Sequence, residues 1–311
     1  MIKNRLEHRI FTFSEYAKRR YGEKTYKIGI STGIICPHRK NNGGCIFCNP
    51  QTFIGDYQKE STSISEQLDI GIQKIIDCCG NGNMLAYFQD ETSTAGDISV
   101  LKQKFEEALN HPKINGLILS TRPDYIDEKV LAMLKSLDTN ITVELGMQSI
   151  HEKSLEFLNR GHTQAQTEKA INLLGRNKIN VGVHLILGIP TEIEYEMIET
   201  VKYVSGNPYI KEVKFHNLVP YKNTKFGKMI ELGEIKPYLI KEHIQNLAAV
   251  IPFVKGDIAI SRLFTSNVRN TNLNIIKYTG NKTKWMNELR ILLNEKDIVQ
   301  GAKTDILYEA E

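Results

Sequence analysis

Short apolar runs alternate with longer segments of helical spacing between residues 27 and 217. The runs have the length and β-branched content of buried strands. In the first helical segment the apolar residues Ile64, Leu68, Ile72 and Ile75 fall on one face, as expected of a helix that covers a sheet. The predicted strands are Lys27–Gly33, Met84–Gln89, Gly116–Ser120, Ile141–Met147, Asn180–Gly188 and Glu212–Asn217. The predicted helices are Ile64–Cys79, Ile98–Asn110, Asp127–Leu137, a pair within Glu152–Asn177, and Ile193–Ser205.

This alternation predicts the α/β class, because a helix between two strands makes them parallel with right-handed crossovers. Six strand–helix units are two short of a closed eight-unit barrel. We therefore expect a partial (β/α)6 TIM-type barrel, with a doubly wound open sheet as the alternative. Both architectures place functional residues at the carboxyl ends of the strands.

The pattern changes after Asn217. Lys236–Val250 is a predicted helix, Asp257–Leu263 a candidate seventh strand, and Thr283–Asn294 a late helix that carries the single tryptophan, Trp285. We expect residues 1–230 to form the partial barrel and residues 231–311 a mainly helical extension packed on it.

Composition and charge are those of an ordinary globular protein. The 311 residues are 41% hydrophobic and 24% charged, and the net charge of +4 permits a polyanionic partner without arguing for one. No stretch approaches the ~18 apolar residues of a membrane span, and the first 22 residues lack the apolar core of a signal peptide. The expected location is the cytoplasm, with no membrane partner. The five cysteines are then expected to be ligands or buried thiols rather than disulfides. Cys78 and Cys79 are expected to end a packed helix as inert, unbridged thiols.

Three of the cysteines share one loop. Cys36, Cys45 and Cys48 follow the first predicted strand, and Gly43 and Gly44 between them tolerate a positive φ and let the chain wrap closely. Three thiolates can ligate three irons of a cubane cluster and leave the fourth iron open. A structural zinc site with His38 as fourth ligand is the alternative, and incidental cysteines are another.

The cysteine loop and several later segments together resemble a known family. Phe47, just before the last cysteine, matches the aromatic position of the radical S-adenosylmethionine (SAM) signature, although the first gap holds eight residues rather than three. The chain is similar to the YhcC/YtqA-like group of that superfamily, and more distantly to the catalytic subunit of Elongator. The segments that carry the likeness are Ala86–Asp90, Ser120–Tyr125, Val143–Ser149, Asn159–His162, His184–Pro190, Ile260–Leu263, and Lys284 through Gly301.

The resemblance implies a [4Fe–4S] cluster on the three cysteines, SAM on the open iron, and reductive cleavage of SAM to a 5′-deoxyadenosyl radical. An electron donor such as flavodoxin or ferredoxin would be required. The SAM contacts that it implies are Phe47, Gln89, Glu144, Gln148, Arg160, Leu187, Gly188 and Leu218. Structural roles are the alternative for each; for example, Glu144 could pair with Arg160, and Leu187 could belong to the core.

The substrate is the least determined feature. Arg122, Asp124 and His184 are candidate substrate residues, with a structural Arg–Asp turn and a core histidine as the alternatives. Elongator-like relatives modify the wobble uridine of tRNA, and two basic stretches could contact phosphates: Lys18–Tyr21, and the lysines at 222, 225 and 228. Three hypotheses remain: a radical enzyme acting on tRNA, a radical enzyme acting on a small metabolite, and a zinc-stabilised binding module without catalysis.

Overall fold

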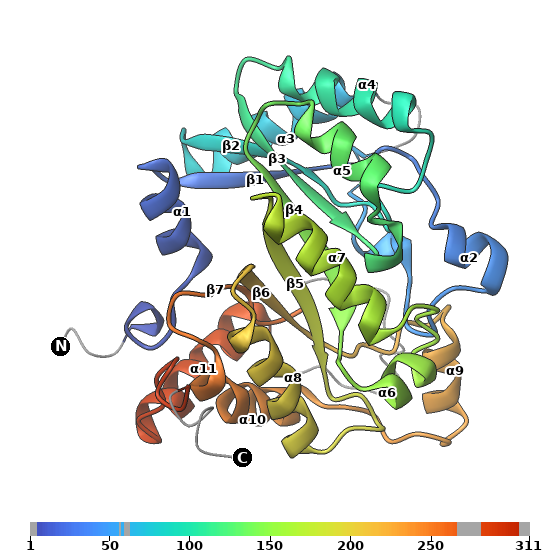
Figure 1. The fold of residues 1–311 in the computed structure, drawn as a ribbon. Helices are drawn as coiled ribbons and strands as arrows, with labels where there is room; N and C mark the ends of the chain where they lie inside the picture. The colour runs from blue at the N-terminus through green and yellow to red at the C-terminus, as the bar shows by residue number, and fades with distance from the viewer. Residues whose placement is uncertain (1–4, 56, 59–62, 266–280, 305–311) are drawn as a thin grey trace.

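The computed structural model describes residues 5–55, 57–58, 63–265 and 281–304. Seven parallel strands form one sheet in the order β1 to β7 (Figure 1). The strands are β1 (Thr25–Ile30), β2 (Asn83–Phe88), β3 (Ile114–Thr121), β4 (Ile141–Gln148), β5 (Asn180–Leu187), β6 (Ile210–Asn217) and β7 (Ala259–Arg262). The predicted α/β class and partial barrel are confirmed. Six strands were one too few, because the candidate seventh strand pairs with β6 in parallel.

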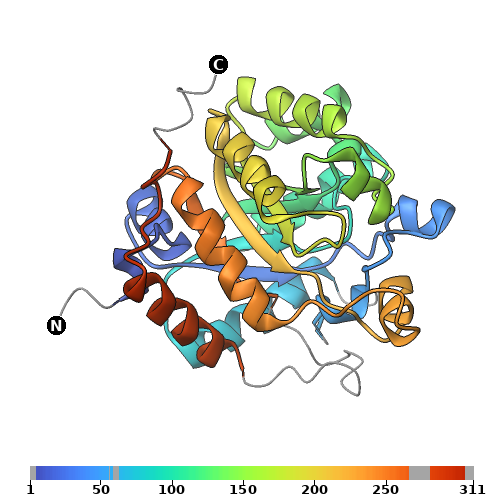
Figure 2. The same ribbon diagram turned by 90° about the horizontal axis from the view of Figure 1, so that it is seen from below.

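The helices lie mainly on the outer face of this sheet (Figures 1 and 2). They are α1 (Phe13–Tyr21), α2 (Pro37–Asn42), α3 (Ile64–Cys79), α4 (Ile98–Leu109), α5 (Glu128–Lys135), α6 (Glu152–Phe157), α7 (Gln164–Arg176), α8 (Glu194–Gly206), α9 (Lys225–Glu231), α10 (Ile240–Val250) and α11 (Lys282–Glu295). Of these, α2 and α9 lie beside the cysteine loop. Local signals explain their starts: Ser63 and Glu66 form a capping box at α3, and Thr163 and Gln166 form one at α7. No helix in the described part of the chain is long and apolar enough to cross a membrane.

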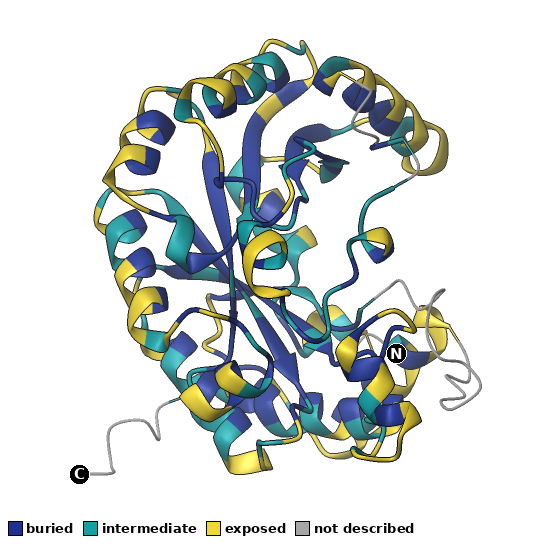
Figure 3. Cartoon of the chain, turned by 90° about the vertical axis from the view of Figure 1, so that its right-hand side faces the viewer, coloured by how far each residue is buried: buried dark blue, intermediate teal, exposed yellow. Residues whose placement is uncertain are grey.

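Side chains alternate between the two faces of each strand. On the outer face Val143, Leu145, Val183 and Leu185 join one large core with the helices. Figure 3 shows these buried strands within helices whose outer surfaces are exposed. The inner face carries charged side chains as well as a small apolar cluster: Lys27 on β1 contacts Glu144 on β4 and Glu212 on β6, each at 3.0 Å. These three strands are not neighbours in the sheet, so the sheet must curl into a half-barrel to bring them together.

The N-terminal segment spans the gap between the first and last strands. The Ile260 amide donates to the Phe11 carbonyl (2.8 Å), and Lys27 lies over the Phe13 ring, 3.9 Å from its centroid. The Gln300 side chain accepts from the Phe11 amide (2.8 Å) and donates to the Ile258 carbonyl (2.8 Å). The extension beyond residue 230 therefore supplies a strand and a clamp to the half-barrel. The division of the chain at residue 230 itself stays a prediction.

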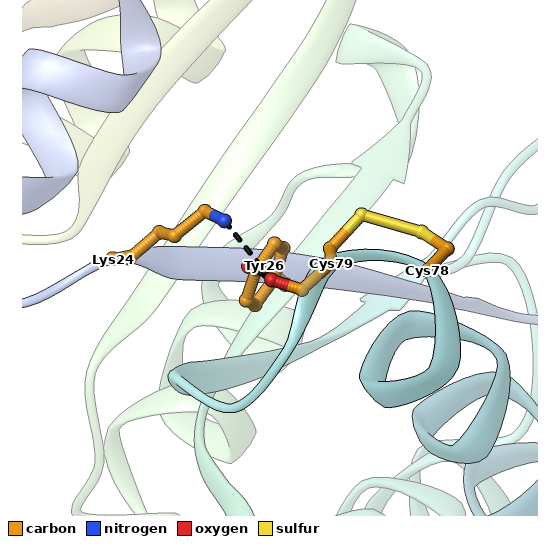
Figure 4. The surroundings of a disulfide bond; sticks show 4 residues. All are labelled: Lys24, Tyr26, Cys78 and Cys79. Carbon is orange, nitrogen blue, oxygen red and sulfur yellow. Dashed lines mark hydrogen bonds between the residues drawn. A yellow bond between two sulfur atoms is a disulfide. The ribbon is translucent and has the colours of Figure 1, made fainter.

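The vicinal cysteines differ from expectation. Cys78 and Cys79 form a disulfide at the end of α3, and both are exposed rather than packed (Figure 4). The prediction of an inert, unbridged pair at a packed helix end is thus wrong. The fully buried side chains of α3 end at Ile72, and the residues from Asp77 to Cys79 at its end are exposed. Its final carbonyl, that of Cys79, accepts from Lys24 Nζ (3.1 Å) and the Tyr26 hydroxyl (2.8 Å).

Candidate functional site

The cysteine loop begins where the chain leaves β1. Cys36 precedes the short helix α2, which fills the long gap before Cys45. Gly43 and Gly44 both have φ of +73°, so the expected positive φ values are confirmed, and they turn the chain back after the helix. A tight turn, in which the Cys48 amide donates to the Cys45 carbonyl (3.1 Å), then brings the last thiol close. The three thiols are free and line one cavity.

The segment after α6 holds this loop in place. The Asn159 side chain donates to the Gly44 carbonyl (2.6 Å), and the Ile46 amide donates to the Leu158 carbonyl (3.1 Å). The His38 ring lies 2.6 Å from the Asn159 carbonyl through Nε2. A Cβ on Gly161, whose φ is +64°, would lie 2.5 Å from His38 Cε1. Only glycine therefore fits this contact without a shift of the ring, and His38 is a support of the loop.

Arg160 bridges the loop and β4. Its guanidinium donates to Cys45 Sγ (3.0 Å) and to the Gly146 carbonyl (2.8 Å). Burial raises the pKa of Cys45, but Arg160 and the His38 hydrogen bond outweigh it and lower that pKa from 9.0 to about 7. For Cys48 burial prevails and raises the pKa of the thiol. The alternative pairing of Arg160 with Glu144 is not found.

A cavity of about 370 Å³ lies inside the carboxyl end of the half-barrel. It contains most of the residues that the sequence pointed to. Those that line it are Cys36, Cys45, Phe47, Cys48, Gln89, Arg122, Gln148, Arg160, His184 and Leu218. Gln148 has a left-handed φ of +71° where the pairing of β4 with β5 shifts register. Such a conformation is costly for a residue other than glycine and is typical of functional sites.

Four predicted site residues do not line the cavity. Leu187 packs in the outer core, because the inward positions of β5 are those of Gly182, His184 and Ile186. Gly188 lies against the Tyr238 ring, and a Cβ on this glycine would lie 2.4 Å from that ring. The Asp124 carboxylate is held by Arg122 in two hydrogen bonds of 2.9 and 3.0 Å. These placements leave Leu187, Gly188 and Asp124 outside the cavity lining, and their contacts with bound molecules stay predictions.

Glu144, the fourth, lies beneath the cavity and is 1% exposed. Its carboxylate contacts Lys214 Nζ, Lys27 Nζ (3.0 Å) and His184 Nε2 (3.0 Å). Burial opposes ionisation of Glu144, yet Lys214 and Lys27 hold its pKa well below the usual range. Burial lowers the pKa of His184 to about 4, so the imidazole is neutral near pH 7. Glu144 therefore closes a buried ionic network under the floor of the cavity.

The sequence did not point to several residues that line the cavity. Asp90 accepts from the Ser31 hydroxyl (2.5 Å) and the Thr32 amide (2.8 Å), which fixes the chain entering the cysteine loop. Glu91 pairs with Arg39 of α2. Both acids directly follow the predicted strand end at Gln89, which was the available signal. Tyr87, His216, Asn217 and Arg262 also line the cavity.

The donor set fits a cluster better than a single ion. No three His, Cys, Asp or Glu side chains in the described ranges converge closely enough to hold one metal ion. A cubane cluster instead takes its three thiolates on three separate irons. The loop offers three soft sulfur donors on one cavity, with an arginine beside one of them to offset negative charge.

Comparison with known proteins decides the family. The model of the radical SAM superfamily matches residues 30–204, and that of the radical SAM C-terminal domain matches residues 210–296. The chain belongs to the radical SAM superfamily. Protein YhcC of Escherichia coli K12 is 31% identical over 290 residues, which cover 91% of this chain and 92% of YhcC. The resemblance to the YhcC/YtqA-like group is thus confirmed. This chain is a radical SAM enzyme, and its cofactors are a [4Fe–4S] cluster and SAM.

The chain is also similar to two more distant proteins. A tRNA uridine(34) acetyltransferase of Methanocaldococcus jannaschii is 31% identical over 187 residues, 57% of this chain and 34% of that protein. The structure of the archaeal Methanocaldococcus infernus Elp3 with an N-terminal deletion superposes with a TM-score of 0.68 at 20% identity. It covers 89% of this chain, which spans only 64% of that one, and it shows the fold alone.

The family chemistry assigns tasks to this chain's own residues. The cluster, when bound and reduced, supplies the electron that cleaves SAM; the protein must bind, orient and exclude water. Arg160 and His38 can hold Cys45 as a thiolate, the ligand form of cysteine. The buried Ile186 and Leu218 and the partly buried Phe47 give the cavity its apolar wall. A non-catalytic zinc-stabilised module is incompatible with this family membership.

Proposed function

We propose that this radical SAM enzyme acts on tRNA, at the side chain of a wobble uridine. The observation that carries the proposal is a set of three exposed lysines, Lys222, Lys225 and Lys228, beside the cysteine loop. Lysines on phosphates supply salt-dependent affinity that is independent of sequence. The similarity to a tRNA uridine(34) acetyltransferase supports the same substrate class.

The three lysines lie beside the cysteine loop because α9 packs on that loop. The Phe226 amide donates to the Ile46 carbonyl (2.9 Å), and Lys225 Nζ lies 3.6 Å from the position of a Cβ on Gly43. Figure 1 shows α2, α6 and α9 together on one side of the molecule and α1 on the other. The basic stretch in α1 is therefore remote from the cavity. Two of its members are engaged within the helix, Arg19 with Glu15 and Arg20 with Tyr16.

The assignment of residues follows from the cavity. Cys36, Cys45 and Cys48 hold the cluster, and the SAM contacts come from the lining residues Phe47, Gln89, Gln148, Arg160 and Leu218. Arg122 and His184 face the substrate; Nη1 of Arg122 is buried without a partner in the described part of the chain. The reductant is a small electron carrier such as flavodoxin or ferredoxin, and the enzyme acts in the cytoplasm.

Iron content after anaerobic reconstitution tests the ligand assignment. The parent chain should bind about four irons, and each of Cys36→Ala, Cys45→Ala and Cys48→Ala should lose most of them. Cys78→Ala with Cys79→Ala is the matched control, since that pair lies at the exposed end of α3, and it should keep parental iron. Retention of iron in any of the three single variants would show that its cysteine is not a ligand.

Two measurements test the substrate. Nucleosides from tRNA of cells that lack the gene should differ at one uridine derivative from those of the parent strain. In binding assays, Lys222→Gln/Lys225→Gln/Lys228→Gln should reduce the slope of log affinity against log salt by about 2–3, near 1 per phosphate contact. A control of equal charge change is Lys18→Gln/Lys113→Gln/Lys178→Gln, which replaces three exposed lysines of other segments. An unchanged nucleoside profile would reject tRNA and leave a small metabolite as the substrate.

A further inference from the structure

The wall of the cavity formed by β6 and β7 carries polar groups that are not among the proposed SAM contacts. His216 and Asn217 end β6, Arg262 ends β7, and all three line the cavity. Asn217 is 4% exposed, and its Nδ2 has no hydrogen-bond partner among the described residues. The same holds for Nε2 of His216. Buried polar groups are normally paired, so unpaired ones that face a cavity indicate a missing ligand.

The hydrogen bonds that Asn217 and His216 already make fix the orientation of their unpaired atoms. The Thr265 amide donates to Asn217 Oδ1 (2.9 Å), which leaves the amide NH2 of Asn217 as a free donor. Thr265 also lies 3.4 Å from Nδ1 of His216 through its hydroxyl, so the opposite ring nitrogen is the unpaired one. The side chains are thus fixed from behind, while their free atoms remain for a bound molecule.

Arg262 is the remaining cation of this wall. Lys27 is paired with Glu144 and Glu212, and Lys214 with Glu144. No described residue accepts a hydrogen bond or forms an ion pair with the half-buried Arg262. Of the cations Lys27, Lys214 and Arg262 on this inner wall, Arg262 is therefore the one that faces no carboxylate among the described residues.

Arg262 also affects the pKa values of His216 and Lys214. Burial is the main cause that lowers the pKa of His216 well below its usual range, and Arg262 is the next. Burial also lowers the pKa of Lys214 to about 7, with Lys27 and Arg262 acting in the same direction against Glu144. In both groups burial is the larger cause, and the charge of Arg262 acts in the same direction.

We propose that Arg262, with Asn217 and His216, binds an anionic group of the substrate, a carboxylate or a phosphate carrying one charge. The guanidinium fork can donate two parallel hydrogen bonds to such a group, and the Asn217 amide can add a third. The subsite would fix the substrate against the β6–β7 wall, apart from the loop that carries the cysteines. The proposal rests on the proposed function and narrows it: the substrate is acidic at the end that enters the barrel.

The test uses the reconstituted, SAM-loaded enzyme and small probes. Thermal unfolding is followed with sodium acetate, inorganic phosphate, sodium chloride and the neutral acetamide at matched ionic strength. We expect acetate or phosphate to raise the melting temperature of the parent, with no effect of acetamide or chloride. Acetate alone would identify a carboxylate, and phosphate alone would identify a phosphate. Equal shifts by acetate and chloride, or none, would overturn the proposal.

Four variants separate binding from folding. Arg262→Gln should raise the half-saturating anion concentration about 10- to 100-fold, the size of a lost charged hydrogen bond, and Arg262→Lys should recover part of it. Asn217→Asp keeps the oxygen that accepts from Thr265 and should abolish anion binding through its own charge. Arg176→Gln, at an exposed position of α7, should match the parent. An anion effect that persists in Arg262→Gln would reject the subsite.

These outcomes are independent of the test for tRNA. An unchanged nucleoside profile with intact, Arg262-dependent anion binding would remove tRNA and retain the acidic substrate. A changed profile without anion binding would retain tRNA and remove the subsite.

Discussion

Replacement of Glu144 by glutamine distinguishes a structural from a cofactor-binding role for this residue. Glutamine keeps the shape but removes the charge that Lys27, Lys214 and His184 face. Lys27 retains Glu212 at 3.0 Å, whereas Lys214 keeps only the Tyr87 hydroxyl at 3.0 Å. Loss of one partner of a buried ion pair costs about 3–5 kcal/mol, because the other charge stays buried without compensation.

The assay is denaturant unfolding of the chain at pH 7, together with SAM binding to the reconstituted enzyme. We expect Glu144→Gln to lower the free energy of unfolding by about 3–5 kcal/mol. The double variant Glu144→Gln/Lys214→Met should recover much of this loss, because it removes the uncompensated charge and leaves the Lys27–Glu212 pair intact. Glu106→Gln, which breaks an exposed pair with Lys102, should change stability by less than about 0.5 kcal/mol.

SAM affinity supplies the contrasting measurement. The Glu144 side chain is 1% exposed and lies outside the cavity lining, so the well-folded double variant should bind SAM within about threefold of the parent, a change of under 1 kcal/mol. A Glu144→Gln variant with parental stability and SAM affinity reduced more than tenfold would refute the structural interpretation. It would restore the direct contact that the family resemblance implied.

Two further predictions concern the loop support and the acid stability. Gly161→Ala should displace His38 and lose at least half of the reconstituted iron. Gly233 has a similar positive φ but no atom within 4 Å of a Cβ at that position, so Gly233→Ala should lower stability by about 1 kcal/mol and lose no iron. Equal iron loss in both variants would show that the His38 contact is unimportant. Burial lowers the pKa of His243 from 6.5 to about 4. Between these pH values the unfolded state binds a proton at this residue and the folded state does not. The free energy of unfolding should therefore fall by about 3 kcal/mol as pH falls from 6.5 to 4. His243→Gln should remove that part of the pH dependence in unfolding curves measured from pH 7 to 4, while exposed His8→Gln should leave it unchanged; parallel curves for all three proteins would refute the assignment.

The sequence was sufficient for the sheet because buried parallel strands leave a strong local signal. All six strands predicted from their apolar runs occur within a few residues of their expected ends, and the glycine pair of the cysteine loop has the expected positive φ. The short helices α2 and α9 were not predicted. Each is held by contacts with distant segments, such as Phe226 with Ile46, and six or seven residues carry little periodicity of their own.

The site was harder to predict, because a position near a strand end does not reveal how deep in the barrel a side chain lies or on which face of the sheet. Leu187 and His184 lie three residues apart on β5, and the alternation of a strand sends one to the helices and the other to the cavity. Glu144 and Gln148 both point inward from β4, but four residues place one beneath the floor and one at the rim. Arg262 lies in the segment Ile260–Leu263, which carries part of the family resemblance, but that likeness assigns it no role. Its proposed role comes from having no counter-ion among the described residues when β7 meets β6, which the paired lysines of other strands reveal. An unpaired charge is a property of the assembled barrel, and for this reason the substrate end of the cavity had to be inferred from the structure.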